Sequence, residues 1–142
     1  MEENKNALDE INKGCTMGIK AIKSIIDKVG NKDFKKELEQ QLTEYNKSED
    51  KINKIYKKYS NKEPHEASSL AKTMTDYMIS LKTMMDHSDS KIAEILLQGT
   101  NMGIIEGRKI LNNKKIADEV KALVKDFVTF QEKAIENIKK YL

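Results

Sequence analysis

The chain has 142 residues, of which 38% are apolar and 35% charged, and its 26 lysines and arginines against 23 aspartates and glutamates give a net charge of +3. This length is typical of one domain, and the lack of any apolar run of about 18 residues excludes a membrane-spanning helix. The single cysteine excludes an internal disulfide and a cysteine-rich zinc site, and one proline with six glycines argues against a protein of strands and turns.

Apolar or small residues recur at steps of three and four near the start of the chain, which predicts an amphipathic helix. They are Leu8, Ile11, Cys15, Gly18, Ile22, Ile25 and Val29. Gly30 predicts the end of this helix, and Asp33 is the expected N-cap of the next. The second helix carries its apolar face on Phe34, Leu38, Leu42, Tyr45, Ile52, Ile55, Tyr56 and Tyr59. Together the two helices predict a first hairpin over about residues 4–59.

Pro64 interrupts the helical pattern, because proline is not tolerated inside a helix. A shorter connector helix is predicted over about residues 66–86, and polar residues 86–90 end it and cap the following helix. Two further helices predict a second hairpin over about residues 89–142, with Asn112 and Asn113 at its turn. No segment alternates apolar and polar residues over the length of a strand, so the prediction is one all-α domain over residues 1–142.

The two hairpins are related by an internal repeat. The segment from Gly14 to Ile19, Gly-Cys-Thr-Met-Gly-Ile, returns from Gly99 to Ile104 as Gly-Thr-Asn-Met-Gly-Ile, an offset of 85 residues. The same offset relates Ile25 to Ile110, Leu38 to Leu123, Leu42 to Phe127 and Tyr45 to Phe130. A connector of this length can return the chain to the other end of the molecule. The prediction is therefore an antiparallel four-helix bundle of two repeated hairpins with a helical crossover connection.

Gly14, Gly18, Gly99 and Gly103 lie in the middle of their predicted helices. A glycine inside a helix costs about 1 kcal/mol relative to alanine, so four of them call for a packing reason. We interpret them as helix-packing glycines that let the first and fourth helices approach each other near a pseudo-twofold axis.

Di-iron carboxylate bundles need a Glu on each of two helices and a Glu-x-x-His on each of the other two. No Glu-x-x-His occurs here, and His65 and His87 both fall in connections. We therefore expect no catalytic residue, no metal site and no cofactor. The alternative is a metal-binding redox or storage protein with non-standard ligands, and its candidates are Glu37, Glu106 and Glu119, with Gln41.

Polar residues on the inner face of the second helix suggest a different kind of site. Gln41 and Ser48 flank Tyr45 at helical spacing, and Gln131 of the last helix is a candidate to join them. We interpret the four as a buried hydrogen-bond network that sets helix register. The alternative is a pocket of a small-molecule carrier.

The sequence resembles the ferritin-like superfamily, and within it a bacterial family of small uncharacterised ferritin-like four-helix-bundle proteins. The similar segments run from Lys13 to Ile19, from Met78 to Lys82 and from Lys91 to Gly99, and the resemblance covers roughly residues 6–142. It implies the bundle with its crossover helix. Metal-binding members carry acidic residues just after these glycines, whereas this chain has Cys15 or Ile19, and Thr100 or Ile104, depending on register. The resemblance therefore implies no ligand for oxidase, ferroxidase or iron-storage activity.

Taken together, the residues predict a non-enzymatic helical bundle with a structural or protein-interaction role, as a homodimer or with another protein partner. The interleaved charges and the single arginine, Arg108, argue against nucleic-acid binding. The start of the chain, Met-Glu-Glu-Asn-Lys, lacks the basic and apolar segments of a signal peptide, so we expect a cytoplasmic protein.

Overall fold

The structure is a computed structural model that describes residues 2–61 and 71–142, and for residues 71–74 it describes the backbone alone. These residues form helices and no strand, which confirms the all-α prediction. The α-helices are α1 (Glu2–Ile25), α2 (Lys32–Tyr56), α3 (Ala71–Thr83), α4 (Asp89–Asn113) and α5 (Asp118–Lys139), and a short 3-10 turn, η1 (Ile26–Lys28), follows α1. No helix among them is long and apolar enough to cross a membrane.

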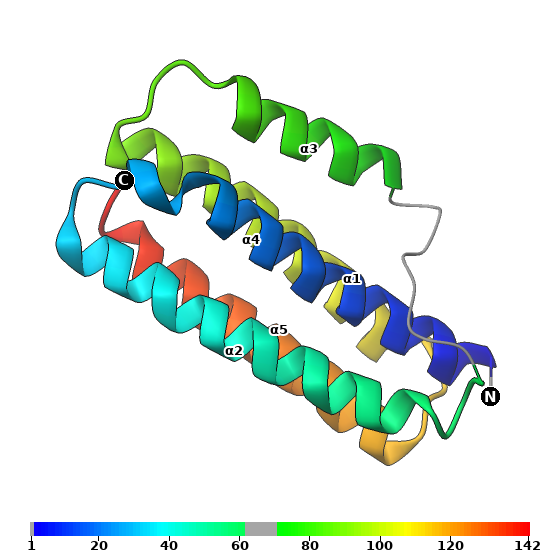
Figure 1. Cartoon of the computed structure of the whole chain (residues 1–142). Helices are drawn as coiled ribbons and strands as arrows, with labels where there is room; N and C mark the ends of the chain where they lie inside the picture. The colour runs from blue at the N-terminus through cyan, green and yellow to red at the C-terminus, as the bar shows by residue number, and fades with distance from the viewer. Residues whose placement is uncertain (1, 62–70) are drawn as a thin grey trace.

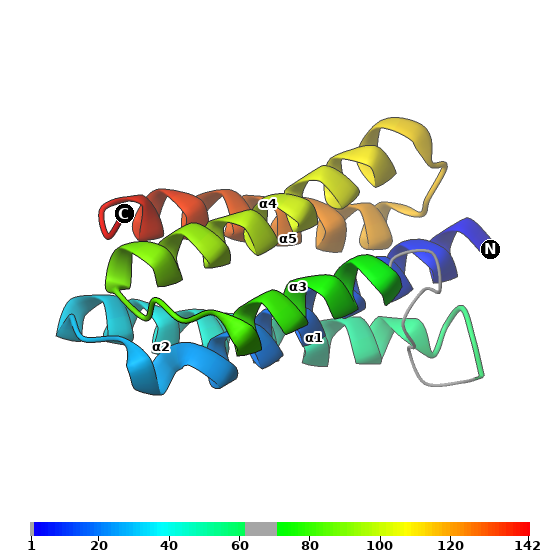
Figure 2. The same cartoon turned by 90° about the horizontal axis from the view of Figure 1, so that it is seen from above.

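Four long helices lie side by side, and α3 lies along the outside of this group (Figure 1). α1 packs against α2, and α4 packs against α5. The two pairs meet where α1 contacts α4 and α2 contacts α5, while α3 packs against α1. The view from above shows the same arrangement (Figure 2). The predicted interruption at Pro64 and the first residues of the predicted connector, 66–70, lie outside the described residues.

The predicted start of the second helix was wrong by two residues. The N-cap is Asn31, whose backbone is extended and whose side-chain Oδ1 accepts hydrogen bonds from the backbone N–H groups of Asp33 and Phe34, at 2.8 and 3.0 Å. Asp33 lies inside the first turn, where its negative charge complements the helix dipole. Asn and Asp are about equally good N-caps, so the sequence pattern alone did not separate them.

The predicted stop at Gly30 also differs from the structure. α1 ends at Ile25 and tightens into η1, which ends at Lys28. None of the described glycines has a positive φ angle, so Gly30 does not end the helix by the left-handed conformation. Its backbone N–H instead donates to Asp89 Oδ1 at 2.8 Å, and the N–H of Asn31 donates to Asp89 Oδ2 at 2.9 Å.

A matching contact joins the hairpins at the other end of the molecule. The side-chain Oδ1 of Asn4 accepts a hydrogen bond of 2.7 Å from the backbone N–H of Ala117, the N-cap of α5. Asn4 and Asp89 are 85 residues apart, which is the offset of the sequence repeat. Each of them is near the start of the first helix of one hairpin and binds the turn of the other hairpin. The two contacts are therefore related by the same offset as the similar sequence segments.

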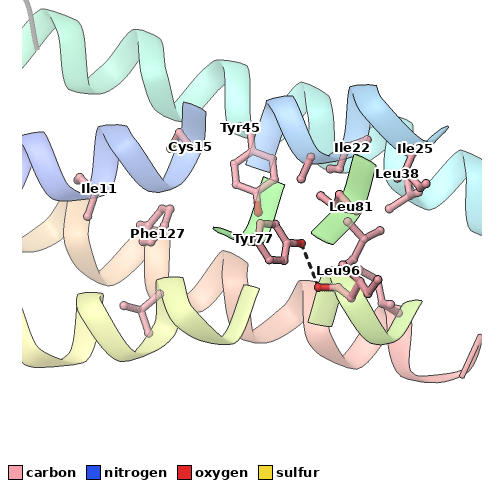
Figure 3. Close-up of a cluster of buried hydrophobic side chains, with 14 of the residues drawn as sticks. Ile11, Cys15, Ile22, Ile25, Leu38, Tyr45, Tyr77, Leu81, Leu96 and Phe127 are labelled. Carbon is pink, nitrogen blue, oxygen red and sulfur yellow. Dashed lines mark hydrogen bonds between the residues drawn. The ribbon is translucent and has the colours of Figure 1, made fainter. Parts of the chain in front are cut away.

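The core contains the apolar faces that the periodicity predicts. Of the seven positions predicted for the first helix, all but Gly18 are buried, and Leu8 and Cys15 are fully enclosed. The core side chains line the space between the helices, with Ile11 of α1 near Phe127 of α5, and Leu96 of α4 near Leu81 of α3 (Figure 3). α3 joins this core through Tyr77, whose hydroxyl donates to the backbone carbonyl of Ile95 on α4 at 3.0 Å.

Candidate functional site

A cavity of about 300 Å³ lies at the centre of the molecule, and all five helices contribute to its lining. Its walls include the four glycines of the repeat, Gly14, Gly18, Gly99 and Gly103. Most of the other lining side chains are apolar, and they include Ile11, Met17, Ala21, Ile22, Leu96, Met102, Ile110 and Phe127. The middle of the repeat is therefore lined mainly by apolar side chains.

The glycines make room for side chains of other helices. A Cβ atom at Gly14 would lie 2.6 Å from Cζ of Phe127, and one at Gly99 would lie 2.5 Å from Oη of Tyr77. At Gly18 it would meet the ring of Tyr45. The nearest atoms are thus side-chain atoms, mainly of rings, whereas the sequence interpretation placed the backbone of a neighbouring helix there. Glycine on one helix is matched to a bulky residue on another.

Tyr45 and Gln131 form a buried polar pair at the centre. Gln131 Nε2 donates to the Tyr45 hydroxyl at 2.9 Å, and that hydroxyl lies 3.3 Å from Gln131 Oε1. Both side chains are buried and line the cavity. Burial raises the pKa of Tyr45, so the phenol stays protonated over the physiological range. The Tyr45 ring also packs edge-to-face on Phe130, its repeat partner, with 4.7 Å between ring centroids.

The other two residues of the predicted polar group diverge. Gln41 is buried and lines the cavity, and its Nε2 donates to Glu37 Oε2 at 2.8 Å. Ser48 is only half-buried and does not line the cavity. Three of the four predicted residues, Gln41, Tyr45 and Gln131, therefore meet at one cavity.

Three charged residues form a polar end of the cavity. Glu10 and Lys13 line it from α1, and Glu106 lines it from α4. Lys13 Nζ lies 4.0 Å from Glu10 Oε2, and only 4% of the Lys13 side chain is exposed. Burial raises the pKa of Glu10, the Lys13 charge lowers it, and the charges of Glu106 and Asp9 raise it further, so that the net shift is upward.

The raised pKa of Glu10 leads to a test by pH. Because the ionised carboxylate is disfavoured in the folded protein, Glu10→Gln should raise the melting temperature at pH 7. The gain should shrink as the pH falls through the raised pKa of Glu10 and vanish below its ordinary value of 4.5, where the carboxyl is neutral in both the folded and unfolded states. Thermal unfolding of both proteins between pH 4 and 8 measures this. A gain that is independent of pH would contradict the assignment.

Comparison with known proteins identifies the family of the chain. The family described as "Domain of unknown function (DUF2383)" matches residues 3–113. The chain belongs to this family. No curated protein and no solved structure matches it. The match to the DUF2383 domain runs from α1 to the end of α4, so it includes the glycines and the polar end of the cavity, whereas Phe127 and Gln131 of α5 lie beyond it.

The structure of this DUF2383 protein does not bring the three candidate metal ligands together. Glu37 Oε2 lies 3.3 Å from Nδ2 of Asn137, near the end of α5, while Glu119, near the start of α5, accepts hydrogen bonds from Tyr59 and Lys58. Since α5 rises about 1.5 Å per residue, these two glutamates are roughly 27 Å apart along it. Glu106 faces the cavity and pairs with Lys109 at 3.6 Å. Among the described residues, no group of three or more His, Cys, Asp or Glu side chains is placed to hold a metal ion.

Sequence reasoning missed Glu10 and Lys13 as lining residues. Glu10 lies one helical turn before Gly14, and Glu106 lies one turn after Gly103. α1 and α4 run in opposite directions where they meet (Figure 1), so these two turns are brought to the same end of the cavity. The sequence contained a partial signal, because Glu10 and Glu106 each lie one helical turn from a glycine of the repeat.

Proposed function

We propose that this DUF2383 domain is a non-enzymatic helical bundle that binds a small, mainly apolar molecule at its centre. The cavity of about 300 Å³ is the observation that carries the proposal. The sequence alone favoured a structural or protein-interaction role, and the cavity favours ligand binding over it.

The size and lining of the cavity support this function. Ligand pockets in proteins typically have volumes of about 300–1,000 Å³ and combine apolar walls with a few polar groups. Smaller apolar cavities, of about 150 Å³, already bind benzene. Here the polar groups include Gln41, the Tyr45–Gln131 pair and the charged end formed by Glu10, Lys13 and Glu106. An apolar ligand would replace contacts that the lining side chains lack when the space is empty.

We place the fold in the ferritin-like superfamily, as an antiparallel four-helix bundle of two repeated hairpins with a helical crossover. The pairing of α1 with α2 and of α4 with α5 supports this placement, as do the equivalent contacts of Asn4 and Asp89.

Ligand binding predicts thermal stabilisation by small apolar compounds. A compound present at 100 times its Kd should stabilise the protein by about 2.7 kcal/mol. For a chain of this length that corresponds to a rise in melting temperature of roughly 5–10 °C. Differential scanning fluorimetry with straight-chain alcohols measures the shift, and native mass spectrometry of the purified protein detects a ligand carried through purification.

A matched pair of variants locates the binding. Ala21→Leu adds a branched side chain to the cavity wall and should reduce the shift, whereas Ala122→Leu places the same side chain on the exposed face of α5 and should leave it unchanged. Equal shifts in both variants would place binding elsewhere and refute the proposal. Stoichiometric iron, manganese or zinc in the purified protein, lost in Glu106→Ala, would favour the metal-binding alternative.

A further inference from the structure

We propose that the cavity prefers a small apolar amine, whose ammonium group is held by Glu10 and Glu106 while its carbon chain lies against the apolar walls. This inference rests on the proposed ligand-binding function and specifies the chemical class of the ligand.

The balance of charge at the polar end favours a cation. The charged groups that act on Glu10 are Asp9 and Lys13 on its own helix and Glu106 on α4. Lys109 pairs with Glu106, but 66% of the Lys109 side chain is exposed, so solvent screens its charge. The cavity itself is lined by two carboxylates and one ammonium group, that of Lys13. Its polar end therefore carries a net negative charge when both glutamates are ionised.

One carboxylate oxygen at this end lacks a hydrogen-bond donor. Glu10 Oε2 is buried, and none of the described residues donates a hydrogen bond to it. The ammonium nitrogen of Lys13 is 4.0 Å away, which is beyond hydrogen-bond distance. An ammonium group on a ligand has three donors and no acceptor, so it would supply the missing donor as a charge-assisted hydrogen bond. The same bond would lower the raised pKa of Glu10 by favouring its ionised form.

Other ligand classes fit this end less well. A carboxylate ligand would find one favourable partner, Lys13, and would face the like charges of Glu10 and Glu106. A neutral alcohol can donate one hydrogen bond to Glu10 but gains no charge attraction. The apolar walls, which include Met17, Met102 and Phe127, accept any of the three carbon chains equally.

The test compares n-hexylamine, n-hexanol and n-hexanoate, which have the same carbon chain and differ in charge at pH 7. Isothermal titration calorimetry of the full chain should give a Kd for the amine about tenfold or more below that of the alcohol, with the carboxylate weakest. In Glu10→Gln and in Glu106→Gln the ratio of alcohol to amine Kd should fall toward one, because the Kd of the amine rises much more than that of the alcohol. Glu39→Gln, on the exposed face of α2, should retain the full ratio.

The outcomes separate this inference from the function on which it rests. Hexanol binding that Ala21→Leu weakens, with hexylamine no tighter than hexanol, refutes the amine preference and retains the apolar site. If hexanoate binds most tightly, the amine preference is refuted as well, and Lys13 is the group that binds the charged end of the ligand. Loss of the amine preference in Glu39→Gln as well as in Glu10→Gln would show a general effect of surface charge and also refute it. If none of the three compounds binds, the proposed function itself fails.

Discussion

Phe127→Ala should lower the free energy of unfolding by about 3–5 kcal/mol, the usual cost of truncating a buried phenylalanine. The Phe127 side chain is buried and fills the space beside glycines of two different helices. A Cβ atom at Gly14 on α1 would lie 2.6 Å from its Cζ, and one at Gly103 on α4 would lie 3.4 Å from the same atom. Removal of the ring therefore weakens the packing of α5 on both helices. Urea-induced unfolding followed by circular dichroism measures the change.

Two comparisons test this account of Phe127. Phe130→Ala truncates a half-buried ring on the same helix and should cost less. In the Phe127→Ala background, Gly14→Ala should become stabilising by about 1 kcal/mol, because the clash is gone and alanine is the better helix former. If Gly14→Ala destabilises both backgrounds equally, the ring is not the reason for the glycine.

Gly18→Ala should destabilise the protein by about 1–3 kcal/mol, although alanine favours a helix by about 1 kcal/mol over glycine. A Cβ atom at this position would lie 2.6 and 2.7 Å from Cε2 and Cε1 of Tyr45. The Tyr45 ring has little freedom to move aside, because Gln131 donates a hydrogen bond to its hydroxyl and the Phe130 ring packs against it in an edge-to-face contact. The added methyl group must therefore displace α1 from α2.

Gly103→Ala is the matched control for Gly18→Ala. The nearest atoms to its Cβ would be Gln131 Oε1 at 3.1 Å and Phe127 Cζ at 3.4 Å, beside the cavity. We expect a change between zero and a gain of about 1 kcal/mol. Thermal unfolding of the two variants separates the effects, and a loss at Gly103 as large as that at Gly18 would contradict the role of Tyr45.

The helices and their buried faces could be predicted from the sequence, because they depend on local spacing. The steps of three and four from Leu8 to Val29 required only a 3.6-residue period, and these residues are buried except Gly18. The ends of the helices depended on finer contacts. Asn31 and Asp33 are both good caps, and only the folded backbone shows that the Asn31 side chain reaches two N–H groups.

The candidate site could be predicted only in part. The four glycines and three of the four residues of the predicted polar group line the cavity. The sequence could point to them because glycine within a helix and polar residues on an apolar face are unusual in themselves. The side chains that fill the space beside each glycine could not be predicted, because Phe127 and Tyr77 come from other helices, and the packing of those helices is known only from the folded structure. Glu10 and Lys13 were missed for the opposite reason: charged residues on an amphipathic helix are ordinary, and burial distinguishes them only after folding.

The reciprocal hydrogen bonds of Asn4 and Asp89 have a consequence for the origin of the chain. Each hairpin supplies the acceptor for the turn of the other, so neither half completes its own hydrogen bonding. A gene encoding one hairpin would yield a product that could make the equivalent bonds within the protein by pairing with an identical molecule, in a twofold-symmetric assembly. Duplication and fusion of such a gene would join the two subunits and leave each half free to diverge. Such divergence would produce differences between equivalent positions of the two halves. Examples are Cys15, which corresponds to Thr100, and Tyr45, which corresponds to Phe130.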